Sequence, residues 1–483
     1  MHASVYPVEN AAFRSRAVSK RLSPSIVSGV VGILDAVAIL VPGMLIYVFY
    51  VGWRVESLQL YLSSLSISTF IVLLAFYAAG LYKFQEIIQL GDQLKKAVAI
   101  SAITCLSLIA LTFALKISEQ LSRVWAFSWF VSGTLSLCAA RFGCHYLLRK
   151  WAETGSLTRN IVIVGAGEQA KRLLAHLRTS KEPWNVIVGV FDDRISRVGA
   201  EFQGLPVLGT ITDLVAFARK FRTDEVFLAM PWCAENRIKA IVGELAELPV
   251  NVHLASDLIS FDYPIDHYHS FASTTTLHLA IRPLDGWQKV AKYIEDKVLA
   301  TLLLIAFLPL MALIALAIKL DSKGPVLFKQ LRFGFNNGAI SVFKFRTMYH
   351  NGDIDSDVSQ ARRDDPRVTR VGRFLRRTSF DELPQLFNVI QGTMSMVGPR
   401  PHAVPHNEEY SRLIRGYFSR HRVKPGITGW AQVNGLRGET KDPEKMKARV
   451  DHDVWYIENW SLLRDFYILA KTANVVWFQK TAY

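Results

Sequence analysis

Two adjacent carboxylates, Asp381 and Glu382, close a stretch of the chain that is crowded with arginines. These arginines are Arg362, Arg363, Arg367, Arg370, Arg373, Arg376 and Arg377. In such a setting one carboxylate can attack a phosphorus atom while a metal ion and the arginines hold the phosphate oxygens. A helix N-terminus beside the carboxylates would also attract phosphate. The residue types therefore predict phosphoryl-transfer chemistry.

The same pair of carboxylates has a structural explanation. Ser379 and Glu382 fit the spacing of a capping box, and acidic residues are favoured in the first turn of a helix. Pro384 is also tolerated there. The two explanations are compatible, because Glu382 can cap a helix while Asp381 reacts, and the sequence leaves both open.

The elements around the carboxylates are expected to be helical and close to a membrane. Val368, Val371 and Leu375 recur at helical spacing, so the arginine-rich stretch is expected to lie on a membrane surface with its arginines toward headgroups or phosphates. Upstream, Val298–Ile318 is strongly apolar but contains Pro309, which removes a backbone hydrogen bond and kinks or breaks a helix. A full span would also place the strongly basic tail from Lys319 outside. We therefore expect a re-entrant membrane helix over 298–320 that breaks at Pro309, inside a mostly α domain over 290–483; a kinked full span is the alternative.

Four apolar stretches fill the first third of the chain, after a basic tail over 1–25. They are Ile26–Tyr50, Leu58–Tyr82, Ala97–Ile117 and Val124–Leu148. Hydrophobic residues make up 51% of the chain, and the mean hydropathy is +0.20. Each stretch can cross about 30 Å of hydrocarbon as a helix. We therefore predict an α-helical transmembrane bundle of four helices over 26–150.

Basic residues give the bundle an orientation. They precede the first stretch, separate the second from the third and follow the fourth, as in Lys20, Lys95 and Arg149. The positive-inside rule places both ends of the bundle in the cytoplasm. Asp35 and Arg141 lie at similar depths within the first and fourth stretches. Isolated charges at that depth are costly, so they are expected either to pair or to extend separately to the interface.

An α/β Rossmann-like domain is expected over 158–256, followed by a linker over 257–289. Buried strands are predicted at Asn160–Val164, Val186–Phe191, Glu225–Ala229 and Val250–Leu254. Helical patterns separate them at Gln169–Thr179, Ile211–Phe221 and Ala234–Leu248. This alternation is typical of a small parallel α/β domain.

The segment Gly165–Ala170 of this domain fits the pattern GxGxxA between a strand and a helix, with Asp192 and Asp193 further on. In that context Gly165 and Gly167 are candidate nucleotide-binding residues, because glycines let a pyrophosphate approach a helix N-terminus. About four predicted strands are fewer than a complete dinucleotide fold has. The pattern therefore favours a module kept for regulation or assembly over a nucleotide site.

The net charge of +15 is compatible with anionic lipid or phosphorylated substrates. Nucleic acid is disfavoured as a partner, because no nucleic-acid-binding motif is apparent. The four cysteines form no CxxC pair and indicate neither a disulfide framework nor a metal site. No cleavable signal peptide is predicted.

The last domain carries four ordered motifs: Phe343–Met348, Leu375–Gln385, Met396–Pro401 and Lys424–Gly435. They strongly resemble the bacterial sugar transferases that prime exopolysaccharide repeats, and the resemblance continues from about Tyr293 to the C-terminus. The N-terminal architecture is similar to the large monotopic phosphoglycosyl transferases. Within that subclass the chain looks most like undecaprenyl-phosphate glucose phosphotransferases, notably through Leu436–Thr440 and Gln479–Tyr483.

The resemblance implies an enzyme of the bacterial inner membrane whose catalytic domain faces the cytoplasm. It would transfer glucose 1-phosphate from UDP-glucose to undecaprenyl phosphate and release UMP. By position, Asp381 would be the nucleophile and the ligand of Mg²⁺, and Glu382 would assist it. Basic family positions around the active site match Lys344, Arg376, Arg400 and, more loosely, Arg437. The segment after Met348 departs from the family pattern, so no acidic role is assigned to it.

Several alternatives stay open. The donor could be another UDP-hexose such as UDP-galactose, the chain could be a non-catalytic scaffold for polysaccharide assembly, and a homo-oligomer is compatible with the sequence. Tyr293 and Lys297 also fit the YxxxK pattern of nucleotide-sugar dehydratases. No second glycine fingerprint accompanies that pattern, so a dehydratase is disfavoured.

Overall fold

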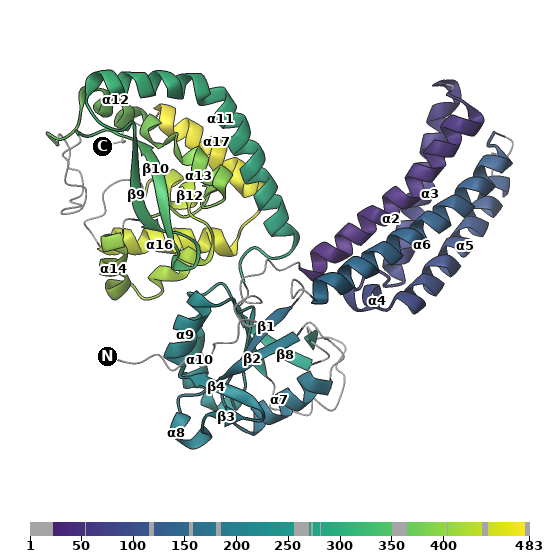
Figure 1. Ribbon diagram of the computed structural model, residues 1–483, viewed down its shortest axis with the longest axis horizontal. Coiled ribbons are helices and arrows are strands. Elements are labelled where there is room, and N and C mark those ends of the chain that lie inside the picture. Colours follow the sequence, from purple (N-terminus) through teal and green to yellow (C-terminus); the bar gives the residue numbers. More distant parts are fainter. Residues whose placement is uncertain are drawn as a thin grey trace. The chain divides into compact units, whose positions relative to one another are not determined.

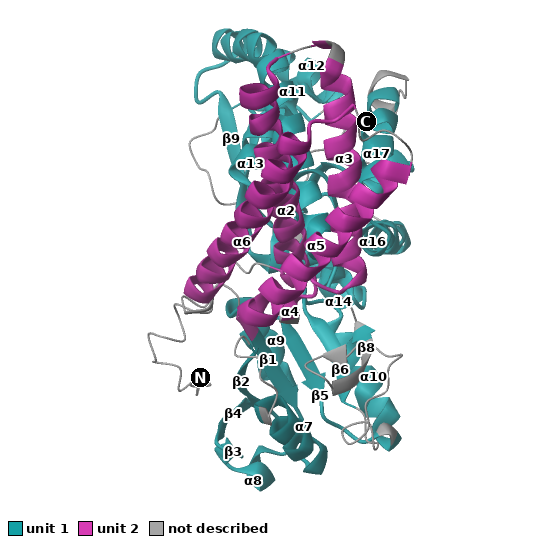
Figure 2. Ribbon diagram, turned by 90° about the vertical axis from the view of Figure 1, so that its right-hand side faces the viewer, with its two compact units in different colours: residues 1–8, 160–483 teal, residues 9–159 magenta. Residues whose placement is uncertain are grey.

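The computed structural model describes residues 23–53, 55–114, 120–153, 158–179, 185–255, 270–271, 274–280, 282–349, 365–402, 404–436 and 443–478. The chain divides into two compact units, one over residues 9–159 and one that holds residues 160–483, drawn in different colours in Figure 2. The first unit is a helical bundle. The second carries an α/β module and a mostly helical domain.

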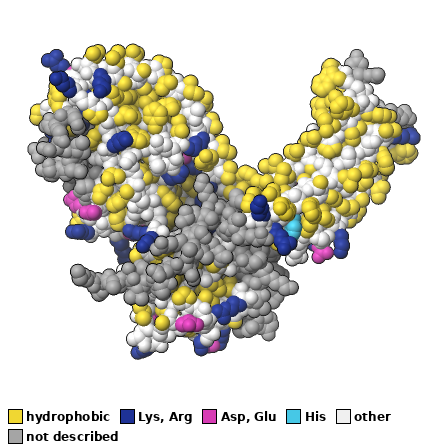
Figure 3. Space-filling view, viewed as in Figure 1, with side chains coloured by type: hydrophobic (Ala, Val, Ile, Leu, Met, Phe, Trp, Pro, Cys, Tyr) yellow, Lys and Arg dark blue, Asp and Glu magenta, His cyan; other side chains and the backbone are white. Residues whose placement is uncertain are grey.

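The bundle contains three apolar helices that could each cross a membrane. Its elements are α2 (Pro24–Ile46), the π-helical turn η1 (Tyr47–Val51), α3 (Val55–Ala78), α4 (Phe84–Ile88), α5 (Leu90–Ala114) and α6 (Arg123–Glu153). Among the described residues, α2 with η1, α3, α5 and, in the other unit, α11 are long and apolar enough to span a membrane. Figure 3 shows hydrophobic side chains over most of the visible bundle surface. The chain is therefore a membrane protein.

The fourth predicted span corresponds to α6, which is a 31-residue helix. It is long enough to cross a membrane, but it is not among the helices that are apolar enough to do so by themselves. Arg141 and several serines lower its hydropathy. Helix α6 packs along α2, where Asp35 neutralises Arg141, and a membrane span for α6 stays a prediction.

Asp35 of α2 and Arg141 of α6 form an ion pair inside the bundle. The Arg141 Nη2 lies 2.6 Å from Asp35 Oδ2, and Nε lies 3.2 Å from Oδ1. Both side chains are 1% exposed, and the guanidinium also lies over the ring of Phe76. The predicted pairing is confirmed, and separate extension of the two side chains to the interface is wrong.

The α/β module is built on one sheet of eight strands with the order β3-β4-β2-β1-β5-β6-β8-β7. The strands are β1 (Arg159–Val164), β2 (Asn185–Phe191), β3 (Glu201–Phe202), β4 (Leu205–Gly209), β5 (Glu225–Leu228), β6 (Asn251–Ala255), β7 (Ser270–Phe271) and β8 (Thr274–Ala280). The helices are α7 (Glu168–Thr179), α8 (Ile195–Val198), η2 (Trp232–Ala234), α9 (Ile211–Lys220) and α10 (Glu235–Leu245). The four predicted strands and three predicted helices are all present.

This sheet is more complete than the sequence suggested. β4 pairs with β2 in parallel, so the run β4-β2-β1-β5-β6 has the 3-2-1-4-5 order of a dinucleotide-binding fold. The expected linker over 257–289 is also partly wrong. Its β8 pairs antiparallel with β6 and covers the edge that β6 would otherwise expose.

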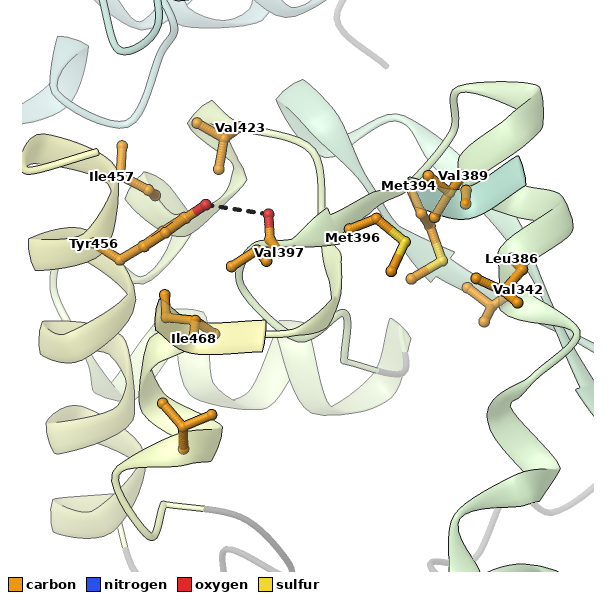
Figure 4. Packing of buried hydrophobic residues seen from close by; sticks show 12 residues of the cluster. Val342, Leu386, Val389, Met394, Met396, Val397, Val423, Tyr456, Ile457 and Ile468 are labelled. Atoms are coloured by element: carbon orange, nitrogen blue, oxygen red, sulfur yellow. Dashed lines mark hydrogen bonds between the residues drawn. The ribbon is translucent and has the colours of Figure 1, made fainter. Parts of the chain in front are cut away.

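The last domain is mostly helical, as predicted. Its elements are α11 (Trp287–Asp321), β9 (Leu327–Phe333), η4 (Phe335–Asn337), β10 (Ala339–Phe345), α12 (Arg370–Thr378), η5 (Phe380–Glu382), α13 (Gln385–Gln391), β11 (Ser395–Val397), α14 (Val404–Leu413), η6 (Tyr417–Arg422), β12 (Gly426–Thr428), α15 (Trp430–Val433), α16 (Pro443–Glu458) and α17 (Leu462–Phe478). Figure 4 shows part of its core, where Leu386 and Val389 of α13 belong to the same cluster as Ile457 and Ile468. In the same view, the Tyr456 hydroxyl donates to the Val397 carbonyl oxygen at 3.2 Å. One apolar core therefore joins α13, β11, α16 and α17.

Helix α11 is continuous over 35 residues and contains Pro309. The helix continues through the proline without a break, Figure 1 shows it changing direction along its length, and the re-entrant path stays a prediction. Its first half contributes Ala300 to the main core of the domain. Its second half contributes Met311 and Ile318 to a cluster with Leu375 of α12. Both halves of α11 thus pack against the same domain.

Candidate active site

A β-hairpin forms one wall of the site. β9 and β10 pair antiparallel, with Lys344 opposite Phe328 and Val342 opposite Gln330. Residues directly opposite each other in such a pair share one face of the sheet. The side chain of Lys344 on this face lies within reach of Glu382. The hairpin therefore places the Lys344 cation beside Glu382, which lies 38 residues further along the sequence.

Helix α12 is held close to this hairpin by Gly372. A Cβ atom built on Gly372 would lie 2.1 Å from the carbonyl oxygen of Thr347, so any larger residue would force the helix away. The Thr369 hydroxyl caps the helix by accepting from the Gly372 amide at 2.9 Å. At the other end of the helix, Arg376 Nε donates to Thr347 Oγ1 at 2.9 Å. Close packing of backbone on backbone thus places Arg376 at the site.

The two carboxylates lie on a short 3₁₀ turn, η5, between α12 and α13. Ser379 ends α12 in the left-handed region, with φ of 59° and ψ of 16°, which is costly for a residue other than glycine. Its side chain makes no capping hydrogen bond, so the predicted capping box is not formed. Glu382 is instead engaged by two cations, and α13 begins after Pro384.

Asn388 fixes α13 to the hairpin. Its Oδ1 accepts from the Phe343 amide at 3.0 Å, and its Nδ2 donates to the Ser341 carbonyl at 2.7 Å. The side-chain amide of Asn388 thus makes the backbone hydrogen bonds that a neighbouring strand would make with β10. Because the carboxylates directly precede α13, this contact sets their distance from Lys344.

Glu382 is neutralised by Lys344 and Arg400. Lys344 Nζ lies 2.8 Å from Oε1, Arg400 Nη2 lies 2.5 Å from Oε1, and Arg400 Nη1 lies 3.1 Å from Oε2. Burial alone would raise the pKa of Glu382, but Arg400 and Lys344 outweigh it and hold the pKa well below its ordinary value. Glu382 is therefore a permanent anion that holds two cations in place.

Asp381 has a different environment from its neighbour. Among the described residues its carboxylate makes neither a hydrogen bond nor an ion pair. Burial and the adjacent Glu382 charge raise the pKa of Asp381 to about 6, against the opposing effect of Lys344, Arg400 and Arg376. At neutral pH the carboxylate is ionised, poorly stabilised and surrounded by cations. These are the properties of a nucleophile that attacks an anionic phosphorus centre.

Residues that sequence analysis missed hold Arg400 in place. Arg420 is 1% exposed; its Nη2 donates to the Arg400 carbonyl at 2.7 Å and lies 2.7 Å from Asp453 Oδ2. Its Nη1 also contacts the ring of His402. Neither Arg420 nor Asp453 lies in a pattern that the sequence marks as catalytic, because their role depends on contacts between distant segments.

The site fits Mg²⁺ only in a limited way. Among the described residues, no three His, Cys, Asp or Glu side chains come together to hold a metal ion. Glu382 is already occupied by Lys344 and Arg400. Asp381 is left as one carboxylate ligand, which suits an Mg²⁺ ion that arrives on substrate phosphates, since Mg²⁺ often takes one or two protein carboxylates.

Two other predicted residue sets have different outcomes. Arg437 lies outside the described residues. Lys297 donates to the Val389 carbonyl at 3.3 Å and to that of Ile390, at the C-terminal end of α13. A lysine in this position stabilises a helix end. Its contacts thus explain the YxxxK pattern without a nicotinamide cofactor.

The glycine segment of the α/β module has Gly165 with φ of 100°, and a Cβ there would lie 2.8 Å from the Ala229 carbonyl oxygen. The nearby Asp192 is fully buried. Its carboxylate accepts from the Ala166 amide at 2.8 Å and pairs with Arg194 at 3.0 Å. The carboxylate that would bind a ribose is thus already engaged within the chain. The geometry at Gly165 and Asp192 favours a structural role over nucleotide binding, whereas a Cβ on Gly167 would meet nothing within 4 Å.

Comparisons with known proteins match both parts of the second unit and the later part of the bundle. The sequence model of a family described as bacterial sugar transferase matches residues 287–479, and that of a CoA-binding domain matches residues 77–256. A UDP-glucose:undecaprenyl-phosphate glucose-1-phosphate transferase of Xanthomonas campestris pv. campestris is 41% identical over 76% of this chain and 77% of its own. Proteins of the same name are 40% identical in Escherichia coli (strain K12), over 75% of this chain and 76% of theirs, and 39% identical in Klebsiella pneumoniae, over 74% and 77%.

Proposed function

Because the chain belongs to the bacterial sugar transferase family, we propose that it transfers glucose 1-phosphate from UDP-glucose to undecaprenyl phosphate and releases UMP. The observation that carries this proposal is the identity of about 40% with three glucose-1-phosphate transferases over three quarters of each chain. The site supports it chemically, since Asp381 has no bonded partner among the described residues and lies in the field of Lys344, Arg400 and Arg376. The product, a lipid-linked sugar, would prime the synthesis of an exopolysaccharide repeat unit.

The reaction proceeds in two steps through Asp381. In the first, an Asp381 oxygen forms a bond to the phosphorus that carries glucose, and the bond from that phosphorus to the UMP oxygen breaks. In the second, a phosphate oxygen of undecaprenyl phosphate bonds to the same phosphorus, and Asp381 leaves as a carboxylate. Each step exchanges one phosphorus–oxygen bond for another, so no other reactant is needed.

The surrounding residues stabilise charge and fix geometry. Lys344 and Arg400 are held by Glu382, so their positive charges are fixed before substrate binds and need little reorganisation during the reaction. Arg376 contributes a third cation near Asp381. Mg²⁺, when bound with the diphosphate, would neutralise phosphate charge, and Asp381 is the described carboxylate that could contact it.

The catalytic domain is proposed to sit on the cytoplasmic face of the bacterial inner membrane, with α11 entering and leaving on that side. The supports are the basic residues at one end of the bundle, such as Lys95 and Lys150, and the packing of both halves of α11 against one domain. Single cysteines at Gln288 and Lys323, introduced after the native cysteines are replaced, test this path. Both should resist labelling from outside intact cells and react after permeabilisation. External labelling at Lys323→Cys alone would establish a full span.

The central experiment measures UMP release by the purified full-length protein in detergent, with undecaprenyl phosphate, Mg²⁺ and a panel of UDP-sugars. We expect release with UDP-glucose, its loss on chelation of Mg²⁺, and its loss in Asp381→Asn. Asp451→Asn, an exposed carboxylate on α16, is the matched control and should remain active. Without lipid acceptor, labelled glucose 1-phosphate should become attached to the protein and not to Asp381→Asn.

Each outcome of this experiment decides a separate statement. Release with another UDP-hexose alone would change the sugar and keep the reaction. Turnover by Asp381→Asn would reject this nucleophile. No release with any UDP-sugar from folded protein would reject the enzyme and favour a scaffold.

A further inference from the structure

Two polar residues of β9 share the face of the hairpin that carries Lys344. The antiparallel register places Phe328 opposite Lys344, Gln330 opposite Val342, and Arg332 opposite Ile340. Side chains alternate along a strand, so Gln330 and Arg332 lie on the same face as Lys344. The catalytic face of the hairpin therefore extends past Lys344 to a second cation.

Arg332 makes contacts only with neutral groups among the described residues. Its Nη2 and Nε donate to Gln330 Oε1 at 2.8 and 3.1 Å, and its Nη1 donates to the Pro401 carbonyl oxygen. Pro401 directly follows Arg400, so two guanidinium-bearing segments lie side by side. Burial, and then the charge of Arg400, lowers the pKa of Arg332 to about 10. A half-buried guanidinium with another cation nearby and no carboxylate of its own is unfavourable without an anion.

The anion that completes this arrangement must come from outside the described residues. Glu382, whose charge also acts on Arg332, is already bonded by Lys344 and Arg400. Arg376 acts on Asp381 instead: its positive charge lowers the pKa of the Asp381 carboxyl. Arg332 thus lies beside the segment of Arg400, through its contact with Pro401, whereas Arg376 is held by Thr347. Guanidinium groups at such positions bind phosphate through paired hydrogen bonds.

The stereochemistry of the two proposed steps indicates a role for Arg332. In an in-line displacement the attacking and leaving oxygens lie on opposite sides of the phosphorus atom. The UMP oxygen therefore leaves on the side away from Asp381, and the lipid phosphate must enter from that same side to displace Asp381. One phosphate subsite thus serves the leaving group of the first step and the attacking group of the second.

We propose that Gln330 and Arg332 form this shared subsite, which binds the UMP phosphate of the sugar donor and then the phosphate of undecaprenyl phosphate. The inference rests on the proposed function and adds a substrate-binding residue to it. Gln330 orients the guanidinium, and Arg332 holds the phosphate oxygens. The shared ligand chemistry is a phosphate monoester, carried first on a nucleoside and then on a lipid.

The test compares UMP with uridine, which lacks the phosphate, as inhibitors of the purified full-length enzyme. In Arg332→Gln the inhibition constant for UMP should rise about 10- to 100-fold, whereas that for uridine should not change. In single-turnover transfer from the labelled protein, the concentration of undecaprenyl phosphate that gives half-maximal rate should rise by a similar factor. Arg332→Lys should recover part of both effects, because it keeps the charge but not the paired donors.

Lys329→Gln is the matched control, since Lys329 is an exposed cation on the opposite face of the same strand. It should leave both inhibition constants unchanged. Equal weakening of UMP and uridine by Arg332→Gln would show a merely structural effect and overturn the proposal. Weakening of only one of the two phosphate ligands would overturn the shared subsite. Failure of the proposed function itself would appear in the unaltered enzyme, as absence of any UMP release.

Discussion

Arg400 forms a two-point ion pair with Glu382, with Nη1 3.1 Å from Oε2 and Nη2 2.5 Å from Oε1. Paired contacts of this kind fix the guanidinium in orientation as well as in distance. The next residue back in the chain, Asp381, has no such contact among the described residues. Of two adjacent carboxylates, one therefore holds two cations and the other has no hydrogen-bond or ion-pair partner among the described residues.

This division predicts opposite stability changes for two similar substitutions. The pKa of Asp381 is raised to about 6, so its proton binds more tightly in the folded state, and the free energy of unfolding falls as the pH rises from the ordinary value of 3.8 through about 6. At pH 8, Asp381→Asn should therefore raise the free energy of unfolding by about 1–3 kcal/mol. The pKa of Glu382 is lowered, so its charge stabilises the fold at that pH, and Glu382→Gln should cost about 2–4 kcal/mol.

Thermal unfolding of both variants in the same detergent checks this contrast. Lowering the pH to about 4 should shrink the advantage of Asp381→Asn, because the native side chain is then protonated in the folded state and no longer buries a charge. A destabilised Asp381→Asn protein at pH 8 would contradict the assignment of the unpaired carboxylate.

The rate should depend on pH through the same groups. Asp381 must be ionised to attack, so kcat/KM for UMP release should rise as the pH passes about 6. Burial lowers the pKa of Lys344, with Arg400 and Arg332 acting in the same direction against Glu382. The alkaline decline should therefore begin below the ordinary titration range of lysine.

Arg376→Gln sharpens this measurement. It removes a cation that lowers the pKa of Asp381, so the acidic limb should move to higher pH. Arg377→Gln, which changes the exposed neighbouring arginine, should not move it. An acidic limb that stays in place in Arg376→Gln would reject Asp381 as its source.

Gly372→Ala should weaken catalysis without touching any charged group. The added Cβ would overlap the Thr347 carbonyl oxygen at 2.1 Å, so α12 must move and carry Arg376 away from Thr347. We expect a loss of about 1–3 kcal/mol in the free energy of unfolding and about a 10-fold or greater fall in kcat. Gly91→Ala, in a helix where the Cβ meets nothing within 4 Å, is the control. Unchanged kcat in Gly372→Ala would show that the contact does not position the arginine.

The ion pair inside the bundle predicts a pattern of loss and recovery. Neutralising Asp35 or Arg141 alone leaves an unpaired charge in a segment that excludes water, so the yield of folded protein in membranes should fall. The swap Asp35→Arg/Arg141→Asp restores opposite charges and should recover part of that yield. Membrane fractionation followed by size-exclusion chromatography measures it. Equal losses in the singles and the swap would show that the pair depends on its side-chain surroundings rather than on its charges.

Local patterns predicted the regular elements well and the edges of the sheet poorly. The strands around Ile163 and Phe227 were predictable because they are continuous runs of buried apolar residues. β4 was missed because it is short and contains Pro206, which is typical of a turn. β8 was missed because it forms a strand by pairing with the edge of β6, and that edge exists only once the sheet has assembled.

The site shows a similar limit. Asp381 and Glu382 were identifiable from their motif, but the motif does not say which of them would be paired. That outcome depends on Lys344 and Arg400, which reach Glu382 from separate segments. Arg332 and Arg420 were missed for the same reason, because neither has a local pattern that marks it. Their importance arises only when β9 and η6 are brought beside the segment that carries Arg400.

Helix α11 also imposes an order on biosynthesis. The residues that pack against its second half, Phe345 and Leu375, are synthesised after the helix itself. The nascent apolar segment therefore stays uncovered until the chain has been synthesised as far as Leu375. Placement of this helix and folding of the domain that follows it are then coupled, and an interrupted chain would leave the apolar surface of α11 exposed to the proteases of quality control.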